Sequence, residues 1–501
     1  MRPNNLIIPF SLVIVMASIL FSCNKNETTT SDNIDRFEEN YPDFAEKMES
    51  KISSIYTENE LYGNVIIAIV DEDGLLYSYS MDREIFDGKN SNFDNDTPFY
   101  IASSTKSFTG TLLKILEKDG LINLDNPISE YIPDLNYNDS VDTKNISIKS
   151  LLNHTHGTFS TRMTWKTAFL GYNNGNNELI NDLNTDFLYD PSGNFRYSNV
   201  GPIISSIAIE NVTGNSWKSE MKEHIFKPLN MTNTSAFVSD YKANDILPSI
   251  TVSKKQGIIE SNFYKQDITM HASGGIISTV NDLSKWLSAN IRKDNNLIKG
   301  DSWSELMNST TAQDKTYYTY HRSGYSLGWD IAEYQNEKIL TRFGGLAGIS
   351  FHISFMPEKN IGVIAFTNDN RAYLLPHLIA NYGYNIINSQ QADSIFEKER
   401  VAFDKSFKRE NEIEYPTDST LLISNKVNDA IIGDYHNNDS WPSISIVKME
   451  NYYLFKWGIL SGKIYENEAV LTSHLGVLSR DFEIKNDTLF TGSLIYKKKN
   501  E

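Results

Sequence analysis

A serine and a lysine three residues apart, Ser103 and Lys106, are the side chains whose types and spacing best suit chemistry. Residues 99–102 are strand-like, and 106–118 have the apolar periodicity of a helix closed by Gly120, so we expect Ser103 at a helix N-terminus. There, unpaired N–H groups and the helix dipole favour negative charge on the serine oxygen. Lys106 falls on the same face one turn deeper. Burial and the positive helix end disfavour its cation, so a lysine whose ordinary pKa is about 10.4 can act as a base.

The same Ser-x-x-Lys pattern also occurs at other serines, and context distinguishes this one. Residues 97–135 resemble the active-serine segment of the class C β-lactamase superfamily, which includes penicillin-binding DD-carboxypeptidases and esterases. Further matching stretches follow in the same order and together cover about residues 40–390; they are ISIKSLLNHTHG (146–157), PSGNFRYSNVGP (191–202), KPLNMTNTSAF (227–237), HASGGIISTVNDLSKWL (271–287) and FGGLAGISF (343–351). The resemblance implies a serine hydrolase that works through an acyl-enzyme and needs no metal or organic cofactor.

A second element of that family is a Tyr-x-Asn motif, which Tyr197-Ser198-Asn199 resembles. This tyrosine follows a Pro-Ser-Gly-Asn turn and precedes an apolar helical pattern, as in the family. The resemblance implies that Tyr197 carries a proton to the leaving group and that Asn199 hydrogen-bonds the substrate. A buried tyrosine with a bonded hydroxyl, in a purely structural role, is the alternative.

The third family element departs from the usual pattern. Arg342-Phe343-Gly344 stands where Lys-x-Gly or His-x-Gly is expected. An arginine keeps the positive charge and can clamp a carboxylate, but it cannot carry a proton. We assign substrate binding to Arg342 and Gly344, and expect the N–H groups of Gly345 and Ser103 to form an oxyanion hole. The alternative is that Arg342 is a surface charge at a strand edge.

Other motifs in the sequence predict different functions. Gly324-Tyr325-Ser326-Leu327-Gly328 matches the nucleophile elbow of α/β-hydrolases, but no helix of sufficient length follows Ser326. The histidines lack metal-ligand spacing, and His154 and His156 are interpreted as structural, with His156 a candidate for lining the pocket. A non-hydrolytic penicillin-binding-like sensor or surface binding protein on the same fold remains the alternative function, favoured by Arg342 alone.

The elements that must position these residues follow from periodicity. Two apolar hairpins, at residues 64–80 and 349–367, predict one antiparallel sheet joined through its first and last strands. Helical patterns lie between and after them, at 106–118, 203–212, 217–225, 280–291 and 374–388. The fold class is therefore α+β, an antiparallel sheet flanked by helices. Short alternating strands near the C-terminus predict a small all-β barrel or sandwich.

The N-terminus has the pattern of an export signal. Arg2 precedes an apolar run, and Leu20-Phe21-Ser22-Cys23 resembles a lipobox whose cysteine becomes lipidated. The formal charge of −18 and the pI near 5.0 argue against nucleic acid as a partner and against electrostatic attraction to anionic lipids. We therefore expect an exported, membrane-anchored lipoprotein with a small-molecule or peptide substrate; the oligomeric state stays open.

We expect five segments along the chain. They are a lipoprotein signal peptide (1–22), a flexible tether (23–36), a serine hydrolase domain (37–392), a linker (393–422) and a C-terminal β domain (423–501).

Overall fold

An eight-stranded antiparallel sheet forms the centre of the larger domain, in the order β2-β1-β14-β13-β12-β11-β10-β9. Its strands are β1 (Val65–Val70), β2 (Leu75–Met81), β9 (Thr311–Tyr317), β10 (Tyr320–Tyr325), β11 (Asp330–Tyr334), β12 (Glu337–Leu346), β13 (Ile349–Met356) and β14 (Ile361–Thr367). This computed structural model describes residues 30–89, 91–255, 257–260, 264–388, 391–414, 429–439, 441–467, 470–475 and 478–499.

The two predicted hairpins meet in the sheet. β1 pairs with β14 from Val65↔Thr367 to Val70↔Gly362, so the first and last parts of the domain lie side by side. All six residues of β1 are buried, and they alternate between two hydrophobic cores, one on each face. Because successive side chains of a strand point to opposite faces, both faces of the sheet are covered. The predicted α+β class is confirmed.

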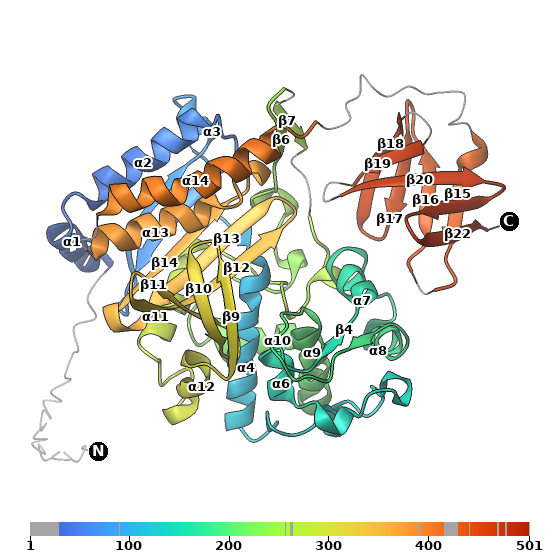
Figure 1. Cartoon of the computed structure of the whole chain (residues 1–501), viewed down its shortest axis with the longest axis horizontal. Helices are drawn as coiled ribbons and strands as arrows, with labels where there is room; N and C mark the ends of the chain where they lie inside the picture. Colours follow the sequence, from blue (N-terminus) through green and yellow to red (C-terminus); the bar gives the residue numbers. More distant parts are fainter. Residues whose placement is uncertain are drawn as a thin grey trace, which may run out of the picture.

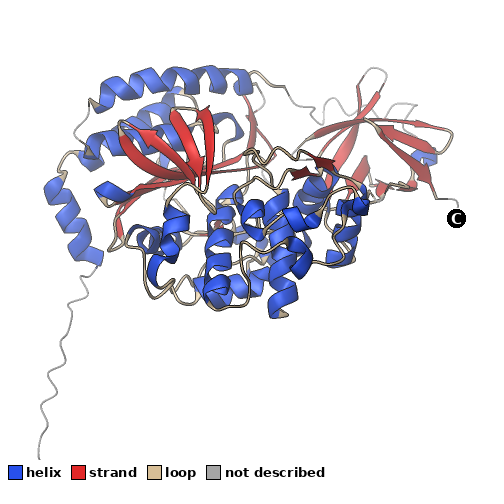
Figure 2. Cartoon of the chain, turned by 60° about the horizontal axis from the view of Figure 1, so that its bottom comes forward, coloured by secondary structure: helices blue, strands red, loops and turns tan. Residues whose placement is uncertain are grey.

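Helices form the layers on both faces (Figures 1 and 2). One layer contains α2 (Phe44–Glu58), α13 (Leu375–Ile387) and α14 (Ala392–Asn411). The larger layer on the other face contains α4 (Thr105–Lys118), α9 (Val200–Thr213) and α11 (Val280–Ile291). Shorter helices complete the domain: α3 (Arg83–Phe86), α5 (Ile128–Tyr131), α6 (Ile148–Leu152), α7 (Thr161–Trp165), α8 (Gly175–Thr185), α10 (Trp217–Met221) and α12 (Trp303–Met307). Short strands pair as β3 (Phe99–Tyr100) with β8 (Ile277–Ser278), β4 (Thr158–Phe159) with β5 (Leu188–Tyr189), and β6 (Thr251–Ser253) with β7 (Gly257–Glu260).

The helix α14 corrects the predicted linker over residues 393–422. Phe396, Phe403 and Phe407 lie on one side of this helix and are buried in the same core as α2 and α13. The Phe396 ring lies 5.1 Å from the ring of Tyr382 on α13. The prediction of a linker was wrong here because the charged residues of α14 lowered its mean hydropathy while its phenylalanines kept helical spacing.

The N-terminal prediction is only partly within the described residues. Helix α1 (Thr30–Asn40) begins inside the segment expected to be a tether. The predicted signal peptide and Cys23 lie outside the described residues. Among the helices of the described segments, none is long and apolar enough to span a bilayer.

The C-terminal strands form a closed barrel. The sequence predicted either a barrel or a sandwich, and the barrel is the form observed. They are β15 (Gly433–His436), β16 (Ile444–Lys448), β17 (Tyr453–Trp457), β18 (Leu460–Asn467), β19 (Val470–His474), β20 (Ser479–Lys485), β21 (Thr488–Thr491) and β22 (Leu494–Lys498). The β18 strand was not predicted, because Gly462 and Lys463 interrupt its apolar alternation. The barrel core also packs against Leu170, Leu346 and Ala347 of the larger domain. Leu346 ends β12, so the barrel touches the strand that carries Gly345.

Candidate active site

Ser103 lies in a single 3₁₀ turn, Ala102–Ser104, that leads directly into α4. Within this turn the Ser104 N–H donates to the Ile101 carbonyl oxygen at 3.1 Å, and the Thr105 N–H donates to the Ala102 carbonyl oxygen. Close packing fixes α4 in place, since a Cβ on Gly110 would lie 1.9 Å from the carbonyl oxygen of Leu327. Ser103 therefore lies at a helix N-terminus, as predicted.

Lys106 lies one turn along α4 and is 1% exposed. Its Nζ is 3.3 Å from Ser103 Oγ, 2.7 Å from Asn199 Oδ1 and 2.8 Å from the carbonyl oxygen of Ser273. Burial, with a smaller contribution from the Arg342 cation, lowers the pKa of Lys106 to about 8 against the opposing effect of Tyr197. A neutral amine in contact with the serine hydroxyl is thus accessible near neutral pH.

Tyr197 places its hydroxyl beside the same groups. Its ring is 44% exposed, but its hydroxyl accepts a hydrogen bond from Arg342 Nη2 at 3.1 Å. The ring centroid lies 4.8 Å from Lys106 Nζ. Burial of the hydroxyl raises the pKa of Tyr197, but the Lys106 and Arg342 cations outweigh burial and lower it to about 8. The phenol and the amine can therefore exchange a proton at little cost.

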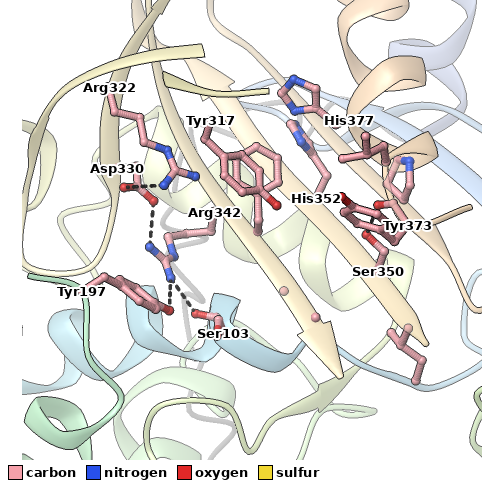
Figure 3. Close-up of a pocket in the computed structure, with 16 residues that line it drawn as sticks. Ser103, Tyr197, Tyr317, Arg322, Asp330, Arg342, Ser350, His352, Tyr373 and His377 are labelled. Carbon is pink, nitrogen blue, oxygen red and sulfur yellow. Dashed lines mark hydrogen bonds and ion pairs between the residues drawn. The ribbon is translucent and has the colours of Figure 1, made fainter. Parts of the chain in front are cut away.

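Arg342 is the residue that departs most from expectation. It is 2% exposed, which excludes the alternative of a surface charge. Its Nη1 pairs with Asp330 at 2.9 Å and with the Tyr325 hydroxyl at 3.2 Å, and its Nη2 donates to Tyr197 and, at 3.2 Å, to the carbonyl oxygen of Ser103. Its terminal nitrogens thus bind the protein itself and orient the tyrosine, as Figure 3 shows. The idea that Arg342 clamps a substrate carboxylate finds no support in this arrangement.

Two glycines of β12 line the cavity at Ser103. A Cβ on Gly344 would lie 2.3 Å from the carbonyl oxygen of Ile101, so only glycine permits this approach. Gly345 faces open space and pairs with Ser350, next to the two-residue hairpin turn after Leu346. In such a hairpin the pair flanking the turn is hydrogen-bonded and the next pair is not, so the Gly345 N–H points away from β13. This geometry leaves it available to a substrate oxygen.

Sequence reasoning missed two supporting groups, the Asp330 carboxylate and the Ser273 carbonyl, whereas it named His154 and His156 as structural. Asp330 holds Arg342 from the neighbouring strand, where no motif marks it. The Ser273 carbonyl lies within the matching stretch 271–287, but a backbone acceptor leaves no signal in sequence. His154 is buried, and its Nδ1 accepts from the Ser198 N–H at 3.3 Å while its ring packs 4.8 Å from Tyr197. His156 is bound to Thr158 and does not line the cavity at Ser103.

The rival nucleophile Ser326 is placed unsuitably. It is 0% exposed and lies in the turn between β10 and β11, where its Oγ accepts the Trp329 N–H at 3.0 Å. No strand-turn-helix elbow exists there, so the α/β-hydrolase reading is wrong. Gly328 of the same motif instead packs against α4, since its Cβ would lie 2.7 Å from the Lys106 carbonyl oxygen.

A cavity of about 340 Å³ opens in front of Ser103 (Figure 3). Its lining consists of Ser103, Tyr197, Tyr317, Arg322, Asp330, Arg342, Phe343, Gly344, Gly345, Ile349, Ser350, His352, Tyr373, Leu374, Pro376 and His377. Within the described ranges, no three His, Cys, Asp or Glu side chains are grouped as metal ligands. The cavity joins Ser103 to a largely aromatic chamber.

Comparison with known proteins agrees with this geometry. A family model described as Beta-lactamase matches residues 50–376. Protein flp of Staphylococcus aureus (strain MW2) is 26% identical over 302 residues, 60% of this chain and 58% of that protein; the unguisins hydrolase ungD' of Aspergillus campestris is 25% identical over 291 residues, 56% and 54% of the two chains. The match therefore spans less than two thirds of these relatives.

Solved structures show the same fold at low identity. The octameric penicillin-binding protein homologue from Pyrococcus abyssi superposes with a TM-score of 0.60 at 20% identity, covering 91% of this chain and all of that one. The D-amino acid amidase from Ochrobactrum anthropi SV3 gives a TM-score of 0.56 at 19% identity, covering 70% of this chain and 99% of that one. With the family model spanning most of the sequence, this chain belongs to the Beta-lactamase family.

Proposed function

We propose that this protein is an exported serine hydrolase that cleaves an amide, ester or β-lactam carbonyl through an acyl-enzyme on Ser103. The observation that carries the proposal is the 3.3 Å contact between Ser103 Oγ and the buried amine of Lys106. A lysine held almost free of water, with its pKa lowered to about 8, can accept the serine proton as the oxygen attacks.

The steps follow from the contacts. Ser103 Oγ bonds to the carbonyl carbon while its proton passes to Lys106, and the N–H groups of Ser103 and Gly345 hold the resulting oxyanion. Tyr197, which lies beside Lys106 and Arg342, delivers a proton to the departing amine or alkoxide and regains one from the Lys106 ammonium. Water then attacks the acyl ester and regenerates the serine. Arg342 acts by keeping the Tyr197 hydroxyl in place.

Covalent labelling tests the proposal. A fluorophosphonate probe is expected to modify the purified protein at Ser103, and Ser103→Ala should abolish the label. Lys106→Ala should slow labelling by about 10²–10⁴-fold, the usual contribution of a general base. Labelling that persists in Ser103→Ala, or an unchanged rate in Lys106→Ala, would contradict the assignment.

The substrate class is the open part of the proposal. A hydrolysis screen with nitrocefin, D-Ala-D-Ala peptides and p-nitrophenyl esters separates the three candidates. Stoichiometric acylation without turnover on any of them would favour the alternative, a penicillin-binding-like sensor.

We also propose that Cys23 carries a lipid that anchors the protein to a membrane. The support is the apolar run ending in Leu20-Phe21-Ser22-Cys23. Metabolic labelling with a fatty acid and detergent-phase partitioning should both be lost in Cys23→Ser. Retention of lipid in that variant would remove the anchor from the proposal.

A further inference from the structure

Exposed tyrosine rings gather at one cavity. Among the described residues, the tyrosines classed as exposed are Tyr189, Tyr197, Tyr317 and Tyr373, and all but Tyr189 line the cavity at Ser103. Tyr317 is 38% exposed and Tyr373 is 40% exposed. Aromatic rings left open to water around one concave site are typical of surfaces that bind a partner group.

The Tyr317 ring is held rigidly. It lies 4.6 Å from the ring of Phe343, and the Arg322 guanidinium packs 4.4 Å from its centroid. Arg322 is in turn paired with Asp330 at 3.5 Å. Because a cation packs on one side of this ring and a second ring on another, the ring loses little conformational entropy when a ligand binds.

The floor of the chamber is also aromatic and uncharged. The rings of His352 and His377 lie 5.0 and 5.1 Å from Phe343, and both histidines are buried. Burial lowers the pKa of His352 to about 3 and the pKa of His377 well below its usual range, so both imidazoles are neutral. Figure 3 shows them beyond Tyr317 on the side away from Ser103.

The opposite wall comes from the loop before α13. The Tyr373 carbonyl accepts a hydrogen bond from Ser350 Oγ at 2.6 Å, which ties this loop to β13. Leu374 and Pro376 continue the apolar lining beside it. We call the chamber formed by Tyr317, Phe343, His352, Tyr373 and His377 the aromatic pocket.

We propose that the aromatic pocket is a specificity subsite that receives an aromatic or similarly bulky apolar group of the substrate, next to the carbonyl attacked by Ser103. The proposal rests on the proposed function, because it assumes that Ser103 is the nucleophile. It adds what the catalytic residues do not determine, namely the side group that the substrate carries.

Boronic acids test it without a known substrate, because boron accepts the Ser103 oxygen as a fourth ligand whichever way its side group points. Methylboronic and 2-phenylethylboronic acids are compared as competitors of fluorophosphonate labelling. The phenylethyl compound should bind about 30- to 100-fold more tightly, as expected for burying a ring that methyl lacks. Equal protection by the two acids, with Ser103 labelled normally, would overturn the subsite and leave the hydrolase proposal intact.

Variants locate the effect. Tyr317→Ala and Tyr373→Ala should each reduce the phenylethyl-to-methyl affinity ratio by about fivefold. Tyr189→Ala, which removes an equally exposed ring outside the cavity, is the matched control and should keep the wild-type ratio. If Tyr317→Ala fails to fold, Tyr373→Ala on the other wall decides the question. An unchanged ratio in the folded wall variants would refute the subsite, and absence of any labelling at Ser103 would overturn both proposals.

Discussion

Replacing Arg342 by glutamine should move the pH dependence of acylation toward alkaline pH. Arg342 lowers the pKa of both Lys106 and Tyr197, and its Nη2 lies 3.1 Å from the Tyr197 hydroxyl. In the wild type, acylation should rise with pH through about 8, because only the neutral Lys106 accepts the serine proton. At pH 7 about a tenth of the lysine is then neutral.

The magnitude follows from charge and distance. Lys106 Nζ and the Arg342 guanidinium carbon lie 4.8 Å and 5.5 Å from the Tyr197 ring centroid. Two unit charges as close as about 4 Å would interact by about 4 kcal/mol at an effective dielectric constant of about 20, which sets the upper bound. Water that enters the space left by the guanidinium screens part of this interaction. We therefore expect the midpoint to rise by about one pH unit, equivalent to about 1.4 kcal/mol.

The assay is the second-order rate constant of fluorophosphonate labelling, measured from about pH 6 to about pH 10. Asp330→Asn provides a test of opposite sign, because the Asp330 charge raises the pKa of Lys106, and its loss should shift the midpoint toward acid. Arg322→Gln removes a cation that pairs with the same carboxylate and should leave the midpoint near its wild-type value. An acid shift in Arg342→Gln, or shifts of one sign in both Arg342→Gln and Asp330→Asn, would refute this electrostatic account.

Further outcomes follow from packing. Gly344→Ala should slow labelling of Ser103 by about 10²-fold and lower the melting temperature, because the added Cβ would clash with the Ile101 carbonyl oxygen. Gly345→Ala should keep the wild-type melting temperature, because its added Cβ would have no neighbour within 4 Å. Phe403→Ala should destabilise the larger domain by about 3–5 kcal/mol in denaturant unfolding, and Val401→Ala, 66% exposed on the same helix, by less than about 0.5 kcal/mol. Equal melting temperatures of the two glycine variants would contradict the close contact at Gly344. Equal free energies of unfolding of the two α14 variants would contradict the burial of Phe403.

The fold could be predicted where local periodicity and turn chemistry agreed. β13 and β14 together span the predicted hairpin over residues 349–367, because two segments rich in apolar residues flank a Pro-Glu-Lys-Asn connection. α11 does so as well, since Thr279 caps its N-terminus through the Asp282 N–H. α14 was missed because only its phenylalanine spacing marks burial, and sequence composition alone does not reveal the core that receives them.

The site could be predicted as a set of residues but not as a network. The sequence shows the helical spacing of Ser103 and Lys106 and the order of the stretches that match the family. These two features were enough to predict that Tyr197 and Asn199 lie beside them. The function of Arg342 depends on Asp330, a partner that only the strand register brings alongside. The role of a residue that departs from a family pattern, such as Arg342, can therefore be assigned only from its contacts in the structure.

The contact between the barrel and the hairpin of β12 and β13 couples two parts of the chain whose sequences could otherwise change independently. Leu346 packs against the barrel core and against the α4 side of the larger domain's core, and it directly follows Gly345 in the chain. Gly458 of the barrel fits against Leu170, since a Cβ on Gly458 would come within 2.6 Å of the Leu170 Cα. Replacing Gly458 by a larger residue should therefore displace Leu170 and disturb the hairpin that carries Gly345, and compensating changes are expected at Leu170 or Leu346. The two domains are expected to evolve as one selectable unit, so a barrel transplanted from a relative should work only with its own hairpin.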